Sequence, residues 1–295
     1  MNYRHAFHAG NPGDVLKHLV LVLCLEHLRR KAKPFVYLDT HAGRGLYDLA
    51  ADSASRTEEH VAGIRRLWGR PPGDPSIARY LEVVAGFNGG AKGGDAPLRH
   101  YPGSPAIAAA LLRADDRMIL CELHPEECAA LRRQLGDDPR VAIHERDGYE
   151  GLRALLPPPI RRGLVLMDPP FERADEWDAL AEGLRLAHRR FATATLAAWY
   201  PVKGGAPLAG FEAAVADAGI DKILKVELAT TGDRSGDRMV GSRVLLINPP
   251  WRLDEALCAA LPRLARELAS APGEGQWAVE WLVGERSAGA ASRRR

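Results

Sequence analysis

The chain has 295 residues, which exceeds the usual domain length of roughly 100–200 residues and predicts one large domain with an insertion, or two domains. With 46% hydrophobic and 26% charged residues it has the composition of a globular protein with a real core, and its net charge of +2 excludes a protein that coats polyanions nonspecifically. No apolar run reaches the roughly 18 residues of a transmembrane helix, and the charged start excludes a secretory signal.

The first 33 residues combine a predicted helix with an excess of positive charge. This stretch has a net charge of +4 and contains four histidines. Apolar residues at helical spacings predict a helix over 14–30, with Asp14 as its N-cap and Arg29, Arg30 and Lys31 at the negative end of its dipole. The stretch therefore offers a local basic surface to an anionic partner.

A short apolar run over 35–39 predicts the first buried strand. The residues directly after it, Asp39-Thr-His-Ala-Gly43-Arg-Gly45, predict a tight turn in which glycine lets the backbone approach a ligand. The turn contains neither the GxGxxG fingerprint nor a GxxxxGK[ST] phosphate loop, so by itself it is only weak evidence for nucleotide binding.

Residues 47–100 interrupt the strand–helix pattern. Helices are expected at 58–68 and 76–87, joined by pieces rich in Pro and Gly, and too few large apolar residues are present for a separate core. We therefore predict a helical insertion. The expected division of the chain is a main domain of 1–46 and 101–284, the insertion 47–100, and a basic disordered tail 285–295.

Strands and helices alternate again after residue 100. Further strands are predicted at 118–122, 141–145, 163–168, 195–200, 223–228 and 243–248. Helices are predicted at 104–113, 125–135, 174–190 and 208–218. Alternation of this kind indicates a parallel sheet with helices on both faces. The last two strands are joined by a Gly- and Asp-rich loop, so we expect a hairpin and a Rossmann-like α/β sheet of seven strands whose last strand is antiparallel.

Acidic residues follow the first three predicted strands. Asp39 ends the first strand, Glu122 ends the second, and Asp147-Gly148 come after the third. At the carboxyl edge of a doubly wound sheet, such acids can accept hydrogen bonds from ribose hydroxyls and from an adenine amino group. Each acid alone is also explained as a helix N-cap or a solvated turn. Together they predict an adenosine pocket without a basic cluster for phosphates.

The fourth strand ends in Asp168-Pro169-Pro170-Phe171. The lone pair of an exocyclic amine on a base is delocalised into the ring, which makes the amine a poor nucleophile. Acceptors on its hydrogens, the Asp168 side chain and the Pro169 carbonyl, would favour tetrahedral geometry, while Pro170 stiffens the turn and Phe171 stacks on the base. The alternative is a rigid proline loop in which Asp168 caps the helix over 174–190.

A second stretch, Asn248-Pro-Pro-Trp251, satisfies the same pattern. The fourth strand is expected beside the first, with its carboxyl end at the proposed ligand site. If the last strand is antiparallel, its carboxyl end lies at the opposite edge of the sheet. We therefore assign the site to Asp168 and a structural turn to Asn248.

Polar residues crowd the segment before the first strand. Tyr3, His5, His8, Lys17 and His18 are too polar to form the buried side of a helix, although a single histidine is usually a surface or a satisfied core residue. We expect a lid in which Tyr3 stacks on a base and Lys17 holds a phosphate or polarises a group. The hypothesis is that residues 1–12 order only when substrate binds.

With these motifs in place, the sequence resembles class I S-adenosylmethionine-dependent methyltransferases that act on adenine N6. The block from Tyr3 to His18, the Asp39 turn, Tyr101-Pro-Gly-Ser104-Pro, Glu122-Leu-His-Pro125 and the Asp147 and Asp168 motifs are similar, in order, to the bacterial 23S ribosomal RNA adenine(2030)-N6-methyltransferase family. The similarity runs from residue 2 to about 284. One departure is Phe171, where a tyrosine is common.

The resemblance implies S-adenosylmethionine as cofactor, S-adenosylhomocysteine as product and no metal. It implies substrate contacts near Tyr3 and His5. It also implies cofactor contacts from His18, His41, Ser104, Glu122, Asp147, Gly148 and Asp168. The implied substrate is 23S ribosomal RNA, with the basic first 33 residues and the insertion as its platform.

The expected activity is therefore methyl transfer to N6 of an adenine in 23S ribosomal RNA. The alternatives are a DNA adenine-N6 methyltransferase and a non-catalytic RNA-binding or assembly factor; a dehydrogenase is disfavoured because the first turn lacks the third glycine. Four scattered cysteines without CxxC spacing argue against zinc and disulfides and fit a reducing cytoplasm. We expect a cytoplasmic monomer that does not bind a membrane.

Overall fold

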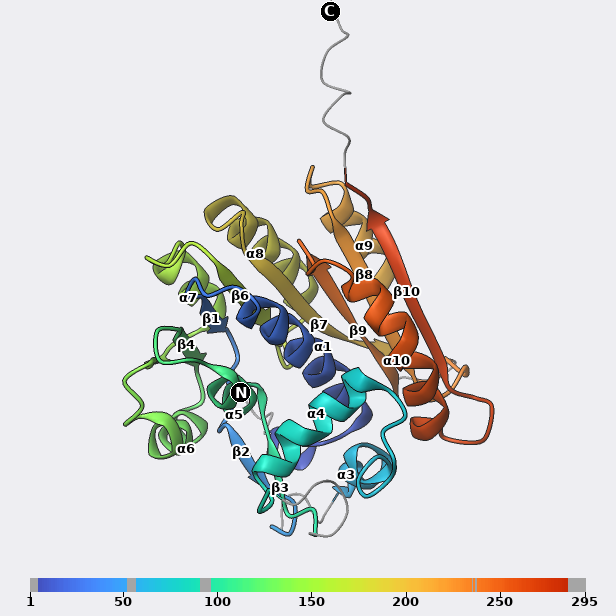
Figure 1. The fold of residues 1–295 in the computed structure, drawn as a ribbon. Helices are drawn as coiled ribbons and strands as arrows, with labels where there is room; N and C mark the ends of the chain where they lie inside the picture. The colour runs from blue at the N-terminus through green and yellow to red at the C-terminus, as the bar shows by residue number, and fades with distance from the viewer. Residues whose placement is uncertain (1–4, 52–56, 91–96, 235, 237, 286–295) are drawn as a thin grey trace, which may run out of the picture.

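The computed structural model describes residues 5–51, 57–90, 97–234, 236 and 238–285. At its centre is an eight-stranded sheet with the strand order β10–β8–β9–β7–β6–β1–β4–β5 (Figure 1). Its strands are β1 (Val36–Asp39), β4 (Arg117–Glu122), β5 (Val141–Glu145), β6 (Gly163–Met167), β7 (Thr195–Lys203), β8 (Ile223–Ala229), β9 (Met239–Ile247) and β10 (Gln276–Val283). A separate pair consists of β2 (Leu46–Asp48) and β3 (His100–Pro102).

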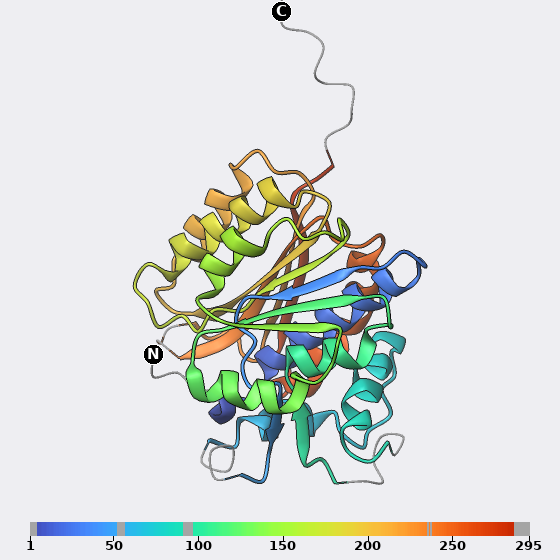
Figure 2. The same ribbon diagram turned by 90° about the vertical axis from the view of Figure 1, so that its left-hand side faces the viewer.

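Two layers of helices cover the sheet, which Figure 2 shows between them. On one face lie α1 (Pro12–Arg29), α4 (Pro75–Gly86), α5 (Ser104–Leu111), α6 (Pro125–Leu135) and α10 (Leu253–Leu268). On the other face lie α7 (Gly148–Leu155), α8 (Glu176–Arg190) and α9 (Leu208–Ala216). Successive residues of a strand serve different layers: Tyr37 packs in the first core and Leu38 in the second.

The middle of the sheet is parallel. β1 pairs with β4 on one side and with β6 on the other, and every residue of β1 and β6 is buried. Strands buried on both faces have continuous apolar sequences, which is why these two were predictable. Because parallel strands end at the same edge, the carboxyl ends of β1, β4 and β6 lie next to one another.

The predicted hairpin at the end of the sheet is confirmed. β9 lies between β7 and β8 and is antiparallel to both. The predicted count of seven strands is wrong by one, because β10 adds an antiparallel edge strand beside β8. Half of β10 is exposed, including Trp277 and Trp281, so its sequence lacks the apolar run that marks a buried strand.

Two helical predictions need correction. The helix expected over 58–68 is divided into α3 (Glu59–Ala62) and the 3-10 turn η2 (Ile64–Arg66) by Gly63. A Cβ at Gly63 would collide with the carbonyl oxygen of Gly10, so the chain bends where it passes this close to the N-terminal segment. α10 was not predicted, since Pro262 lies inside it and proline usually ends a helix.

The segment 47–100 leaves and rejoins the main domain through β2 and β3, which pair so that Tyr47 lies opposite Tyr101. Its buried side chains, including Ile64 and Tyr80, belong to the same core as α1 and α10. No helix in the described part of the chain has the length and apolar character needed to cross a membrane. The architecture is the expected α/β, Rossmann-like fold.

The second proline motif lies far from the carboxyl edge of the parallel strands. Asn248 follows the antiparallel strand β9, and its Nδ2 donates to the carbonyl oxygens of Ala192 and Ala194 at 2.8 and 3.1 Å. Its φ of 52° is one that asparagine adopts more readily than most residues. The prediction that Asn248 belongs to a structural turn is confirmed.

Candidate active site

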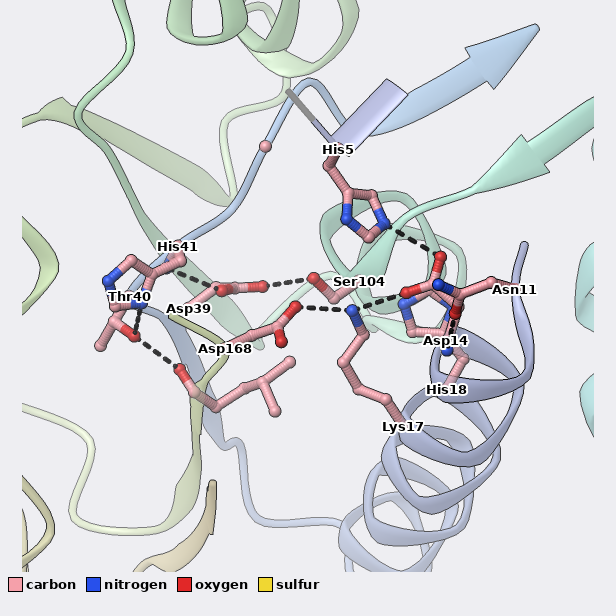
Figure 3. A network of polar contacts seen from close by, with 12 residues as sticks. His5, Asn11, Asp14, Lys17, His18, Asp39, Thr40, His41, Ser104 and Asp168 are labelled. Carbon is pink, nitrogen blue, oxygen red and sulfur yellow. Dashed lines mark hydrogen bonds and ion pairs between the residues drawn. The ribbon is translucent and has the colours of Figure 1, made fainter. Parts of the chain in front are cut away.

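Acidic side chains reach one edge of the sheet from three neighbouring strands. Asp39 ends β1, Glu122 ends β4, and Asp168 directly follows β6. The loops that follow β1, β4 and β6, together with the start of α1, line a cavity of about 540 Å³. Figure 3 shows the polar contacts at this edge: Lys17 of α1 contacts Asp168 after β6, and Asp39 at the end of β1 contacts Ser104 and His41.

Most residues expected to bind a cofactor or substrate meet at this cavity. Those lining it are His5, Lys17, His18, His41, Ser104, Glu122, Asp168, Pro169, Pro170 and Phe171. Asp147 and Gly148 do not line it, and Tyr3 lies outside the described residues. The gathering of residues from both ends of the domain supports the expectation that this edge holds the site.

Lys17 connects α1 to the end of β6. Its Nζ donates to Asp168 Oδ2 at 2.5 Å and lies 2.7 Å from Asp14 Oδ1 (Figure 3). The side chains of Lys17, Asp14 and Asp168 are 5%, 2% and 15% exposed, so one ammonium faces two carboxylates almost without water. In such surroundings the ion pairs fix the position of each group.

Asp14 has a different role from the N-cap predicted for it. The N-cap of α1 is Asn11, whose Oδ1 accepts the N–H of Asp14 at 2.9 Å. The Asp14 carboxylate is buried and accepts instead from His5 Nε2 and the Gly10 N–H, at 2.9 and 2.8 Å. Sequence gave no sign of this, since a carboxylate near a helix start is usually a cap.

Burial and charge act in opposite directions on this cluster. Burial lowers the pKa of Lys17, but the charges of Asp14 and Asp168 outweigh it and raise the pKa above its ordinary value. Burial raises the pKa of Asp14, but the charges of His5 and Lys17 outweigh it and hold the pKa well below its ordinary range. At neutral pH Lys17 is therefore charged and Asp14 ionised, and Lys17 does not act as a base.

Two of the histidines that line the cavity, His18 and His41, are neutral at neutral pH. Burial lowers the pKa of His18 to about 3 and that of His41 to about 4. The Oη of Tyr101 lies 2.7 Å from His18 Nδ1, and Thr40 Oγ1 lies 2.8 Å from His41 Nδ1. Both rings are thus held in place and available for hydrogen bonds rather than ion pairs.

Asp39 and Glu122 organise the loop after β1. Asp39 is fully buried and accepts from Tyr37 Oη, Ser104 Oγ and the His41 N–H. Glu122 accepts the N–H of Gly43 through Oε2 and the N–H of His124 through Oε1, both at 2.7 Å. Burial raises the pKa of each acid. Of the two, Glu122 lines the cavity. Asp39 does not line it, and its hydrogen bond from the His41 N–H holds the loop after β1 in position.

Asp147 caps α7, which is one of the two roles predicted for it. Its Oδ1 accepts the N–H groups of Tyr149 and Glu150 at 2.9 and 3.0 Å, which makes it the N-cap of α7. Gly148 allows the start of α7 to approach the turn after β1, since a Cβ there would overlap the carbonyl oxygen of Thr40. Both residues shape the edge of the site in this structure without lining the cavity.

Gly148→Ala is expected to lower the free energy of unfolding by about 1–3 kcal/mol, because the added Cβ forces α7 away from Thr40. Urea unfolding measures the change. The control is Gly210→Ala in α9, where a Cβ meets no atom within 4 Å and alanine is the better helix former. Equal stability of Gly148→Ala and the wild type would contradict the close packing at Thr40.

An aromatic wall continues the cavity beyond Asp168. The Phe171 ring lies 4.6 Å from Trp177 and 6.2 Å from Trp199, measured between ring centroids. Lys17 Nζ lies 5.9 Å from the centre of the Trp199 ring. The N-cap of α8 is Asp175, so the alternative that Asp168 caps this helix is wrong. Trp199 lines the cavity but was not predicted, since it lies in the middle of a strand without a motif.

The insertion holds the N-terminal segment. Glu59 Oε1 lies 2.8 Å from His8 Nδ1, and Glu59 Oε2 accepts from Asn11 Nδ2 at 3.0 Å. The Ile64 N–H donates to the carbonyl oxygen of Gly10 at 2.9 Å. These contacts tie residues 5–12 to the insertion, and the hypothesis that residues 1–12 order only when substrate binds stays a prediction.

Glu59→Gln is expected to lower the pKa of His8 toward its ordinary value of about 6.5, because the hydrogen bond to the Glu59 carboxylate is the main cause that raises it. NMR titration of the histidine ring protons measures the change. The control is Glu58→Gln, one residue earlier, where the removed charge does not contact His8. An unchanged His8 pKa in Glu59→Gln would contradict the contact.

Comparison with known proteins agrees with this geometry. A protein named Ribosomal RNA large subunit methyltransferase J from Haemophilus influenzae is 44% identical over 285 residues, which is 97% of this chain and 100% of that protein. Its namesake from Escherichia coli K12 is 42% identical over the same shares. A crystal structure of a Legionella pneumophila protein superposes with a TM-score of 0.84 at 34% identity, covering 93% of this chain and 98% of the other.

A family model matches residues 32–283, which include β1, β4, β6 and the whole Asp168 motif. The two relatives extend the similarity over nearly the whole chain. The chain therefore belongs to the family described as ribosomal RNA large subunit methyltransferase D, RlmJ.

Proposed function

We propose that this chain transfers a methyl group from S-adenosylmethionine to N6 of an adenine in 23S ribosomal RNA. The observation that carries the proposal is Asp168-Pro-Pro-Phe171, placed at the carboxyl end of β6 on the cavity and held there by Lys17. The two relatives whose names describe large-subunit ribosomal RNA methyltransferases support the choice of substrate.

The residues of the cavity fit the proposed cofactor. Glu122 offers carboxylate oxygens to ribose hydroxyls, beside a turn in which Gly43 has a φ of 63°. His18 Nε2 is buried and has no hydrogen-bond partner in the described part of the chain, so it is free for a ligand. Within the described residues, no cluster of His, Cys, Asp and Glu is suited to a metal ion. When bound, the cofactor supplies an electrophilic methyl group.

The protein contributes position and charge to the transfer. Lys17 holds Asp168 Oδ2, while Asp168 Oδ1 has no partner among the described residues. We assign Oδ1 to one hydrogen of the adenine amine and the Pro169 carbonyl oxygen to the other, which directs the nitrogen lone pair at the methyl group. Phe171 stacks on the base. Oδ1 then receives the released proton, directly or through water.

The adenine has to leave its stack to reach this depth, which favours an unpaired or loop nucleotide. Arg66 of the insertion, Lys203 and Arg238 also line the cavity. We assign the flanking phosphates to these cations and to the basic N-terminal stretch.

The proposal is tested by transfer of labelled methyl from S-adenosylmethionine to ribosomal RNA of a strain that lacks the gene. The expected result is incorporation into 23S RNA, with N6-methyladenosine as the product found by mass spectrometry after digestion. Adenine-containing duplex DNA is the parallel substrate. Incorporation into DNA alone, or into a base other than adenine, would contradict the proposal.

Glu122→Gln is expected to weaken binding of S-adenosylmethionine by about tenfold or more, because the amide loses the charge and one acceptor while Gly43 and His124 compete for what remains. Isothermal calorimetry measures the affinity. The control is Glu145→Gln on the neighbouring strand β5, whose side chain is 45% exposed and does not line the cavity. Equal affinities of the two variants would remove Glu122 from the binding site.

A further inference from the structure

A chain of three polar side chains connects α4 to the cavity. The Oη of Tyr80 lies 3.0 Å from the Oη of Tyr101, which in turn lies 2.7 Å from His18 Nδ1. Tyr80, Tyr101 and His18 are 1%, 0% and 1% exposed, so water does not compete for these contacts. The second ring nitrogen, His18 Nε2, has no partner in the described part of the chain, and His18 borders the cavity.

The hydrogen bonds of this chain can run in two orders, and a third arrangement, in which both neighbours donate to Tyr101, leaves the Tyr101 hydrogen without an acceptor. Each tyrosine hydroxyl carries one hydrogen, and a neutral imidazole carries one on either Nδ1 or Nε2. In the first order His18 Nδ1–H donates to Tyr101, and Tyr101 donates to Tyr80. In the second order Tyr80 donates to Tyr101, and Tyr101 donates to a bare His18 Nδ1.

Only the second order gives every hydroxyl hydrogen an acceptor. In the first, the Tyr80 hydrogen has none, because Tyr101 is the sole partner of Tyr80 Oη in the described structure. A buried hydroxyl hydrogen without an acceptor is strongly disfavoured. Burial raises the pKa of both tyrosines and lowers that of His18, so all three groups are neutral at neutral pH.

We propose that Tyr101, which accepts from Tyr80, fixes His18 in the tautomer that carries its hydrogen on Nε2, which makes His18 a neutral hydrogen-bond donor to the ligand of the cavity. A carboxylate accepts hydrogen bonds but does not donate them, so Glu122 and Asp168 do not suit an anionic ligand group, whereas the Nε2–H of His18 does. The identity of that group rests on the proposed function: we assign it to the carboxylate of S-adenosylmethionine. Tyr101 is thus a positioning residue.

The tautomer is measured directly by NMR on the full chain labelled with ¹⁵N-histidine, without ligand. Nitrogen shifts and ring couplings distinguish a protonated from a bare ring nitrogen. The expected result for His18 at neutral pH is hydrogen on Nε2 and a bare Nδ1. Hydrogen on Nδ1 overturns the proposal, and this measurement needs no variant.

Two matched substitutions test which tyrosine sets the tautomer of His18. Tyr101→Phe removes the donor to Nδ1, so the His18 nitrogen shifts are expected to move toward a mixture of the two tautomers. Tyr80→Phe removes an equally buried hydroxyl but leaves Tyr101 with Nδ1 as acceptor, so the hydrogen is expected to stay on Nε2. Unchanged His18 shifts in Tyr101→Phe overturn the role of Tyr101.

Binding of S-adenosylmethionine tests the ligand part separately. Tyr101→Phe is expected to weaken the affinity by about three- to tenfold in calorimetry, the effect of one hydrogen bond. The control is Tyr200→Phe, which removes another buried hydroxyl, one that donates to Glu212 and does not line the cavity. If the wild type has the Nε2 hydrogen but does not bind S-adenosylmethionine, the proposed function fails and the tautomer stands. Equal binding by Tyr101→Phe and Tyr200→Phe overturns the donor role.

Discussion

Asp168→Asn is expected to lower kcat for methyl transfer by at least about 10³-fold while leaving the affinity for RNA within a few-fold. The amide keeps the shape of the side chain but loses the negative charge that orients the amine and receives its proton. It also removes one of the two carboxylates that neutralise Lys17. Single-turnover rates at saturating S-adenosylmethionine measure the effect without interference from product release.

The chain contains its own control for this experiment. Asn248→Asp makes the reciprocal exchange in the second Pro-Pro-aromatic motif, at the opposite edge of the sheet. It is expected to lower stability, because a carboxylate cannot replace the Asn248 amide as donor to the carbonyl oxygens of Ala192 and Ala194. It is expected to change kcat by less than about threefold. Loss of activity in Asn248→Asp with an unchanged rate in Asp168→Asn would reverse the assignment of the two motifs.

Lys17→Met is expected to lower kcat by about 10²-fold and the free energy of unfolding at neutral pH by about 3–5 kcal/mol. Methionine fills the volume but leaves Asp14 and Asp168 facing each other without the cation between them. Single-turnover kinetics and urea unfolding give the two values.

The stability loss has a predicted dependence on pH. The depressed pKa of Asp14 contributes stability above its unfolded value of about 3.9, and this contribution disappears as the pH falls through the folded value. The difference between wild type and Lys17→Met is therefore expected to shrink in acid. Lys17→Met combined with Asp14→Asn is the matched double variant, expected to regain stability but not kcat. A constant difference from pH 7 to pH 3 would contradict the charge cluster.

The parallel strands and the edge that carries the site were predictable because their signals are local. β1 and β6 are uninterrupted apolar runs, and Asp39, Glu122 and Asp168 stand directly at the ends of strands. In contrast, β10 is a half-exposed edge strand, and α10 contains Pro262. Such elements exist through tertiary contacts that outweigh local preference.

The connections within the site could not be predicted in the same way. Lys17 and Asp168 are 151 positions apart, and His8 and Glu59 are 51 apart, so no spacing rule relates them. Lys17 was expected to hold a phosphate or polarise a group, and its ammonium lies between two carboxylates. Asp147 caps α7 through Oδ1, and its contact with adenine stays a prediction.

The central claim is that Asp168 directs methyl transfer to an adenine of 23S ribosomal RNA. Its most direct test is mass-spectrometric mapping of methylated adenines in that RNA from three strains: the wild type, a strain that lacks the gene, and the deletion strain that expresses Asp168→Asn at wild-type level. We predict one N6-methyladenosine that is present in the wild type and absent from the other two. An identical set of N6-methyladenosines in all three strains would contradict the account.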